Sequence, residues 1–195
     1  MNEFYLYLKM GLDHILDLNG LDHILFVITL CAIYNLKEYK KVLILVTAFT
    51  IGHSLTLALS ALEVLSINST VVEILIPVTI LLTAIYNINF YNKSLKTTIY
   101  INYLMALFYG LIHGLGFSNF FKAMMMGQDQ IVFPLFSFNL GIEIGQLFIV
   151  LLLLVILYIY TRLLKKEHYS WNLVLSGAGA GIALTMILER ILITF

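Results

Sequence analysis

Long stretches of apolar residues alternate with short polar segments along the whole chain. A helix needs about 20 mostly apolar residues to cross the hydrocarbon core of a bilayer. By that measure the spans cover roughly residues 21 to 36, 41 to 64, 70 to 90, 98 to 117, 131 to 161 and 171 to 193. The pattern predicts an all-α membrane protein, a bundle of about six transmembrane helices that forms a single domain over residues 1–195.

The segment before the first span has a different pattern. Apolar Phe4, Leu8, Leu12 and Ile15 recur at helical spacing, and polar side chains fill the positions between them. This periodicity is typical of a short amphipathic helix that lies at the membrane interface or re-enters the membrane. Gly20 then interrupts the helix before the first span.

Composition supports a membrane location. Hydrophobic residues make up 61% of the chain, charged residues 11%, and the mean hydropathy is +0.97, which is far too apolar for a soluble domain. The 11 Lys and Arg residues balance the 11 Asp and Glu residues, and no basic block indicates nucleic acid as a partner. The lipid bilayer is therefore the expected surrounding. The single cysteine, Cys31, excludes an intrachain disulfide or thiolate cluster.

The placement of charge predicts an orientation. Lys and Arg favour cytoplasmic loops, and eight of the 11 follow the first, third or fifth span: Lys37, Lys40, Lys41, Lys93, Lys96, Arg162, Lys165 and Lys166. These connections are therefore predicted to be cytoplasmic, with both termini outside. Four of the five histidines and nine of the 11 acidic residues then belong to the outer half. The sequence therefore predicts one cluster of polar residues, and it faces the outside.

The first span begins with Asp22 followed directly by His23. Neighbouring residues on a helix point about 100° apart, so the two side chains cannot both aim straight at one ion. A division in which one ligates and the other orients is easier, because an imidazole that binds metal usually gives its second N–H to a carboxylate. Asp22 or Asp17 could fill that role. Alternatively, Asp22 only complements the dipole at the helix start.

Two later spans carry a histidine beside small residues. His53 lies between Gly52 and Ser54. Ser54 is either a close-packing residue bonded to its own helix backbone or a nucleophile activated by His113 and Asp22. His113 is followed by Gly114, which leaves space for a neighbouring backbone or a ligand.

The fifth span carries a polar stripe. Asn139, Glu143 and Gln146 are spaced four and three residues apart and share one helix face, with Gly141 in a groove beside them. A carboxylate at this place predicts either a part in a site or an interhelical hydrogen-bond network that stabilises the bundle.

These motifs have a family likeness. The ordered series GLDHILF, FTIGHSLTL, FYGLIHGLGF and FNLGIEIGQL, closed by ERI, resembles the HupE/UreJ family of bacterial membrane proteins over about residues 11 to 191. Members are regarded as nickel or cobalt permeases, or as accessory proteins of hydrogenase and urease systems. The resemblance implies a multi-pass protein of the bacterial cytoplasmic membrane.

Carried over position by position, the resemblance also implies a set of metal-binding residues: His14, Asp22, His23, His53, His113 and Glu143. The family pattern commonly places five residues between the first histidine and the Asp-His pair, whereas seven separate His14 from Asp22 here. We therefore expect the stretch from Asp17 to Asn19 to bulge so that His14 can reach the pair.

Three functions are consistent with these residues. Neutral imidazole with carboxylate suits divalent nickel, cobalt, zinc or copper, which favours a metal permease or a metal-uptake accessory protein. The alternative is an intramembrane zinc-dependent hydrolase acting on a lipid or membrane-embedded substrate, with Glu143 or Asp22 as the general base. A third is a bundle whose polar residues only join helices. The oligomeric state, including a homo-oligomer, stays open.

Overall fold

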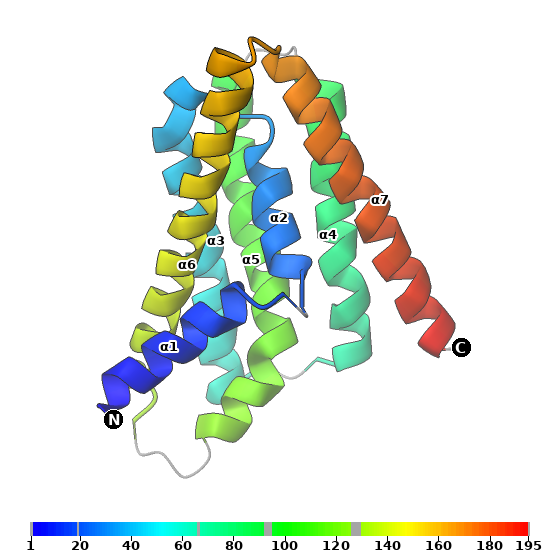
Figure 1. Ribbon diagram of the computed structural model, residues 1–195. Coiled ribbons are helices and arrows are strands. Elements are labelled where there is room, and N and C mark those ends of the chain that lie inside the picture. Colours follow the sequence, from blue (N-terminus) through cyan, green and yellow to red (C-terminus); the bar gives the residue numbers. More distant parts are fainter. Residues whose placement is uncertain (1, 19, 66, 92–94, 126–129, 195) are drawn as a thin grey trace.

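The structure is a computed structural model that describes residues 2–194 apart from 19, 66, 92–94 and 126–129. All regular elements of the described part are helices (Figure 1), including two short ones, the 3-10 helix η1 (Leu36–Glu38) and the π-helix η2 (Ile159–Leu163). The seven α-helices are α1 (Glu3–Ile15), α2 (Asp22–Cys31), α3 (Tyr39–Ala61), α4 (Ser69–Phe90), α5 (Leu95–Met125), α6 (Val132–Tyr158) and α7 (His168–Thr194). Among the described residues, α3 to α7 are long and apolar enough to cross a membrane.

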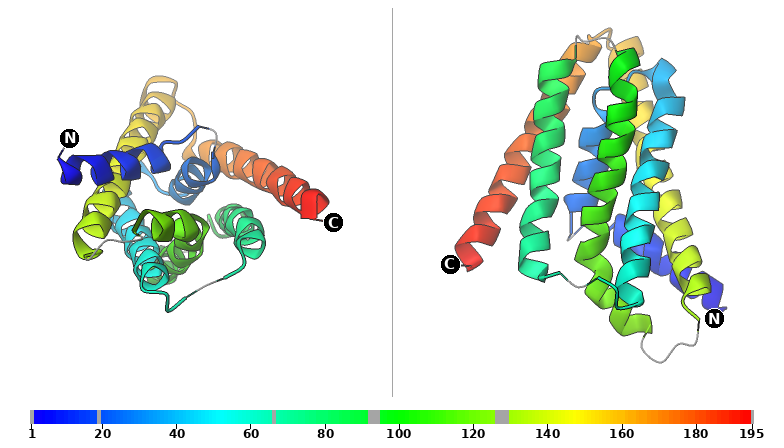
Figure 2. Two further views of the ribbon diagram at one scale, coloured as in Figure 1. Left: turned by 90° about the horizontal axis from the view of Figure 1, so that it is seen from below. Right: turned by 180° about the vertical axis from the view of Figure 1, so that it is seen from behind.

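The five long helices run lengthwise around α2, and both termini lie at the same end of the bundle (Figures 1 and 2). We call this the terminal end. The opposite end carries η1 and the connection from α6 to α7, and we call it the basic end for its residues Lys37, Arg162 and Lys166. Lys93, which was expected on this side, lies outside the described residues.

The structure corrects the prediction of a full span over residues 21 to 36. Helix α2 has only ten residues, which rise about 15 Å, or half the hydrocarbon core. The following residues Ala32 to Tyr34 are buried without being helical. Such backbone is tolerated at depth when protein groups satisfy it, and the carbonyl of Tyr34 accepts a hydrogen bond from His168 Nε2 at 3.0 Å. Apolarity alone could not reveal where the helix ends.

Helix α1 lies obliquely across α6 (Figure 2) and buries Tyr7, Gly11 and Ile15 on one face. The predicted helix is confirmed, but of its predicted apolar face only Ile15 is fully buried, while Phe4, Leu8 and Leu12 are half-buried. The two helices meet backbone to backbone. A Cβ at Gly11 would collide with the carbonyl oxygen of Phe138, and a Cβ at Gly141 would collide with that of Leu8. This close approach fixes the last turn of α1 against the centre of the bundle.

Helices α3 and α5 are joined in the same way. A Cβ at Gly52 would collide with the carbonyl oxygen of Leu107, and one at Gly110 with that of Phe49. A Cβ at Gly114 would lie 2.6 Å from the carbonyl oxygen of His53. The space beside His113 that the sequence predicted is thus filled by the backbone of α3.

The contact between α1 and α6 can be tested with a matched pair of alanine variants. Gly141→Ala places a methyl group against the Leu8 carbonyl, whereas a Cβ at Gly177 meets nothing within 4 Å. We expect Gly141→Ala to destabilise the protein by about 1 to 3 kcal/mol, as other overpacked sites do. Thermal unfolding in detergent measures this against Gly177→Ala. Equal melting temperatures for the two variants would contradict the packing.

Candidate metal centre

Three histidines from three helices converge in the terminal half of the bundle. His14 comes from the last turn of α1, His23 from the first turn of α2 and His53 from α3, and each offers a ligand atom within 4.8 Å of the other two. Nitrogens bound to one ion at about 2.1 Å can lie no more than about 4.2 Å apart. The three rings are therefore close to coordinating geometry, and we call them the histidine cluster. The unequal chain spacing did not prevent His14 from reaching His23, since their ring centroids are 4.6 Å apart.

The ring nitrogens of the cluster have lone pairs to offer. Nε2 of His14, Nε2 of His23 and both ring nitrogens of His53 are buried and have no hydrogen-bond partner among the described residues. Buried polar atoms are normally bonded, so each such atom needs an explanation. Burial, with a smaller effect of the neighbouring His23, holds the pKa of His14 well below its usual range. The lowered pKa favours the neutral imidazole of His14, which is the form that binds metal.

Asp22 orients His23. Its Oδ1 lies 3.0 Å from Nδ1 of His23 and also accepts the backbone N–H of His23 at 2.9 Å. A carboxylate can only accept here, so Nδ1 carries the proton and Nε2 presents its lone pair to the cluster. Asp22 and His23 thus have the different roles that their angular separation on a helix predicted. The imidazole of His23 faces the cluster, and the carboxylate of Asp22 lies behind it.

His113 lies beside the cluster. Its ring centroid is 5.1 Å from that of His23, and its Nε2 is 3.0 Å from Oγ1 of Thr79. The Thr79 hydroxyl gives its own proton to the carbonyl of Ile76 at 2.7 Å, so it accepts from Nε2 of His113. Nδ1 of His113 then keeps a lone pair, and this atom is buried without a hydrogen-bond partner in the described part of the chain.

A cavity of about 290 Å³ connects the cluster with the surface at the terminal end. Its lining runs from the buried His23 to the exposed Asp17 and Glu73, and Arg190 pairs with Glu73 at 3.2 Å. Asp22 also lines it, so three carboxylates face this space. We call it the acidic cavity. The three carboxylates outnumber Arg190, and an excess of negative charge in a cleft raises the local concentration of cations.

The polar stripe of α6 faces α3. Oε1 of Glu143 accepts a hydrogen bond from Thr47 at 2.6 Å, and Oε1 of Gln146 accepts one from Thr50 at 2.8 Å. Asn139 donates to the carbonyl of Leu135 on its own helix at 2.7 Å. The structure does not bring Glu143 into the group of three histidines. Both interhelical bonds instead tie α6 to α3.

Ser54 has the geometry of a packing residue. Its hydroxyl donates to the carbonyl of Thr50 at 2.7 Å, one turn earlier on α3. A serine that gives its proton to its own helix backbone is not poised to give it to a neighbouring base. This hydrogen bond therefore gives no support to a nucleophilic role.

Comparison with known proteins agrees with this picture. A family model described as HupE / UreJ protein matches residues 1–190, which is nearly the whole chain. The chain belongs to the HupE/UreJ family. HupE/UreJ proteins are membrane proteins, and membership suggests a role in nickel or cobalt uptake or an accessory role in handling these metals. No curated protein and no solved structure matches the chain.

The HupE/UreJ motifs also contain neighbours of the cluster that sequence reasoning overlooked. Phe117 closes the motif around His113, yet its ring lies 4.1 Å from that of His14 and is stacked on Phe138. Phe49 lies 5.1 Å from His113. These rings give the imidazoles an apolar surrounding, which favours their uncharged form. No feature of the sequence marked Thr79 as a neighbour of the site, because a threonine in an apolar helix is common.

The orienting role of Asp22 predicts a graded loss of metal affinity. Removing an outer-shell partner typically costs 10- to 100-fold in affinity. We expect Asp22→Asn to weaken nickel binding by roughly that factor at unchanged stoichiometry, and His23→Ala to remove the bound ion. Asp13→Asn serves as the control, since Asp13 is exposed and pairs with Lys9. Titration of purified protein with nickel measures all three, and wild-type affinity in Asp22→Asn would refute the role.

Proposed function

We propose that this HupE/UreJ protein is a permease that captures a divalent transition metal ion, of the nickel or cobalt type, at the histidine cluster. One observation carries the proposal: three imidazoles from three helices, two of them buried and that of His14 half-buried, bring unpartnered nitrogens close together beneath an acidic cavity. Family membership supports the same metals. The ion is cargo, and the protein lies in the bacterial cytoplasmic membrane.

The basic residues indicate which end of the bundle faces the cytoplasm. Lys37, Arg162 and Lys166 lie together at the basic end, and such residues favour the cytoplasmic side. The terminal end and its acidic cavity then face outward. An ion would meet carboxylates first and imidazoles second, and it would exchange its water for protein ligands as it moves inward.

Each polar residue has a place in this scheme. His14, His23 and His53 supply nitrogen ligands, and Nδ1 of His113 offers a fourth. Asp22 holds His23 in the binding tautomer. Because the ligands sit on separate helices, a small shift of α1 against α2 would take His14 away and weaken the site. Repeated movement of that kind is how a transporter releases an ion without a second strong site.

The other candidates have less support. An accessory protein that holds metal without moving it would use the same site as a permease. Only a measurement of transport distinguishes these two functions. The zinc hydrolase has no observation in its favour, since Ser54 is bonded to its own helix and Glu143 to Thr47. Nitrogen donors accept zinc as readily as nickel, so zinc is the natural competitor in binding experiments.

Transport can be tested by nickel accumulation in cells that express the protein. We expect His23→Ala and His53→Ala each to lower the accumulation rate by about tenfold or more, because loss of one ligand removes well over 1.4 kcal/mol of binding. Ser54→Ala is the control, and it should behave as wild type. Membrane levels of each variant are compared by immunoblot.

Two outcomes would count against the permease. Unchanged accumulation in both histidine variants would remove the cluster from transport. Stoichiometric nickel binding by a wild-type protein that does not raise accumulation would favour the accessory role instead.

A further inference from the structure

The basic end holds a cavity whose charge is opposite to that of the acidic cavity. It has a volume of about 350 Å³ and lies where η1, the end of α6 and the start of α7 meet. Lys37, Arg162 and Lys166 line it, and its lining contains no Asp or Glu. His168 lines it as well, but both ring nitrogens of His168 are already bonded within the protein. We call this space the basic cavity.

The three cations of the basic cavity have no counter-charge from the described part of the chain, where none of them forms an ion pair. The carboxylate of Glu38, on the neighbouring turn, is engaged by Lys41 at 2.6 Å and by the backbone N–H of Asn35 at 3.2 Å. Glu167 is exposed and does not belong to the lining. Like charges that share a cavity repel one another. An anion bound among them would relieve this repulsion.

The backbone after α6 holds two of the cations at the basic cavity. Arg162 lies in the π-helix η2, and π-helical turns are rare and occur frequently at functional sites. Lys165 then adopts a left-handed conformation with φ of 52°, and the N–H of Lys166 donates to the carbonyl of Tyr160 at 3.1 Å. This bond folds the chain back onto the end of α6. Lys166 therefore lines the same cavity as Arg162.

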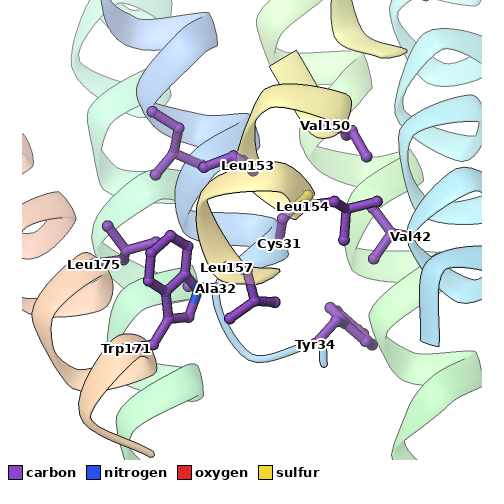
Figure 3. Close-up of a pocket in the computed structure, with 11 residues that line it drawn as sticks. Cys31, Ala32, Tyr34, Val42, Val150, Leu153, Leu154, Leu157, Trp171 and Leu175 are labelled. Atoms are coloured by element: carbon purple, nitrogen blue, oxygen red, sulfur yellow. The ribbon is translucent and has the colours of Figure 1, made fainter. Parts of the chain in front are cut away.

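An apolar crevice leads from the basic cavity into the membrane, and its cause is the shortness of α2. This helix contacts both α6 and α7 but ends at Cys31. Figure 3 shows the result: Cys31, Leu154 and Trp171, from these three helices, line a small apolar cavity of about 10 Å³. Leu157 lines both this small cavity and the basic cavity, so the two spaces adjoin.

The crevice widens again toward the middle of the membrane. A groove of about 400 Å³ lies along α2 and α6 and is lined by apolar side chains. It shares Ile28 and Leu153 with the small cavity and extends to Phe148. Phe148 lies nine residues before Leu157, or about 14 Å along the helix, and one leaflet of the hydrocarbon core is about 15 Å thick. The crevice thus has the length of one acyl chain.

Aromatic residues mark the depth of the basic cavity. Trp171, the single tryptophan of the chain, contacts Tyr160 with ring centroids 5.6 Å apart. Trp and Tyr are enriched where the hydrocarbon core meets the headgroups. Because Trp171 lines the small cavity that adjoins the basic cavity, the cations lie at the level of lipid phosphates.

We propose that the basic cavity binds the phosphate of an anionic phospholipid, one acyl chain of which lies along the crevice between α6 and α7. Arg162 can pair with two phosphate oxygens at once, and Lys37 and Lys166 add two further charges. The small cavity is too narrow for the chain, which passes over the half-buried Leu153 and Leu154 at its rim into the groove. Basic pockets between transmembrane helices are known to bind such headgroups. The inference does not rest on metal transport.

A matched pair of double variants tests the site. The cavity variant, Lys37→Gln with Arg162→Gln, removes two positive charges from the lining. The control variant, Lys40→Gln with Lys165→Gln, removes two positive charges from the same end, and both of its residues are exposed and lie outside the lining. The pair therefore separates a specific site from a general attraction between a basic surface and an anionic lipid.

Native mass spectrometry of the purified protein in a neutral detergent measures the affinity for added phosphatidylglycerol and phosphatidylcholine. We expect the wild type to bind phosphatidylglycerol about tenfold or more tightly than phosphatidylcholine. The cavity variant should bind phosphatidylglycerol about 25-fold more weakly than wild type, from about fivefold for each cation removed. The control variant should keep the wild-type affinity. Nickel affinity at the histidine cluster should be unchanged in both variants, which shows that they are folded.

Three outcomes would overturn the lipid site. The first is equal affinity of the wild type for the two lipids, and the second is an equal loss in the cavity and control variants. The third is displacement of phosphatidylglycerol by inorganic phosphate at the same concentration, because that ion lacks the acyl chain. If the cavity variant loses nickel binding through misfolding, the single variant Arg162→Gln decides: its affinity for phosphatidylglycerol should fall about fivefold, and a wild-type value overturns the site.

Discussion

The histidine cluster depends on the direct contact between the backbones of α1 and α6. Helix α1 has 13 residues and would be marginal in isolation, so packing must hold it in place. Gly11 and Gly141 allow the two backbones to touch, and the last turn of α1 then presents His14 to His23. The α3–α5 contact through Gly52 and Gly114 positions His53 and His113 in the same way. The positions of the histidine side chains in this protein therefore depend on glycines that let neighbouring helices touch.

Much of the fold and part of the site could be predicted from the sequence. Helices α3 to α7 follow the long apolar runs, because length and apolarity are what a membrane demands. The unequal geometry of Asp22 and His23 follows from their angular separation. The length of α2 could not be predicted, since the buried turn that follows it is as apolar as a helix. Nor could the partner of Glu143, because periodicity tells which residues share a face and not which helix that face meets.

Charge is separated along the bundle although the chain is neutral overall. Carboxylates of Asp17, Asp22 and Glu73 line the opening at one end, while Lys37 and Arg162 line the opening at the other. The two ends of the bundle therefore differ in charge although the chain as a whole carries none.

The brevity of α2 also bears on how the protein is made. Two backbone carbonyls in or just after this helix accept hydrogen bonds from side chains that come later in the chain. The carbonyl of Thr29 accepts from Asn87 of α4, and that of Tyr34 accepts from His168 of α7. During synthesis α2 emerges before either partner exists, and ten helical residues are too few to cross the membrane alone. The two hydrogen bonds that satisfy these carbonyls can therefore form only after α4 and the start of α7 have been made.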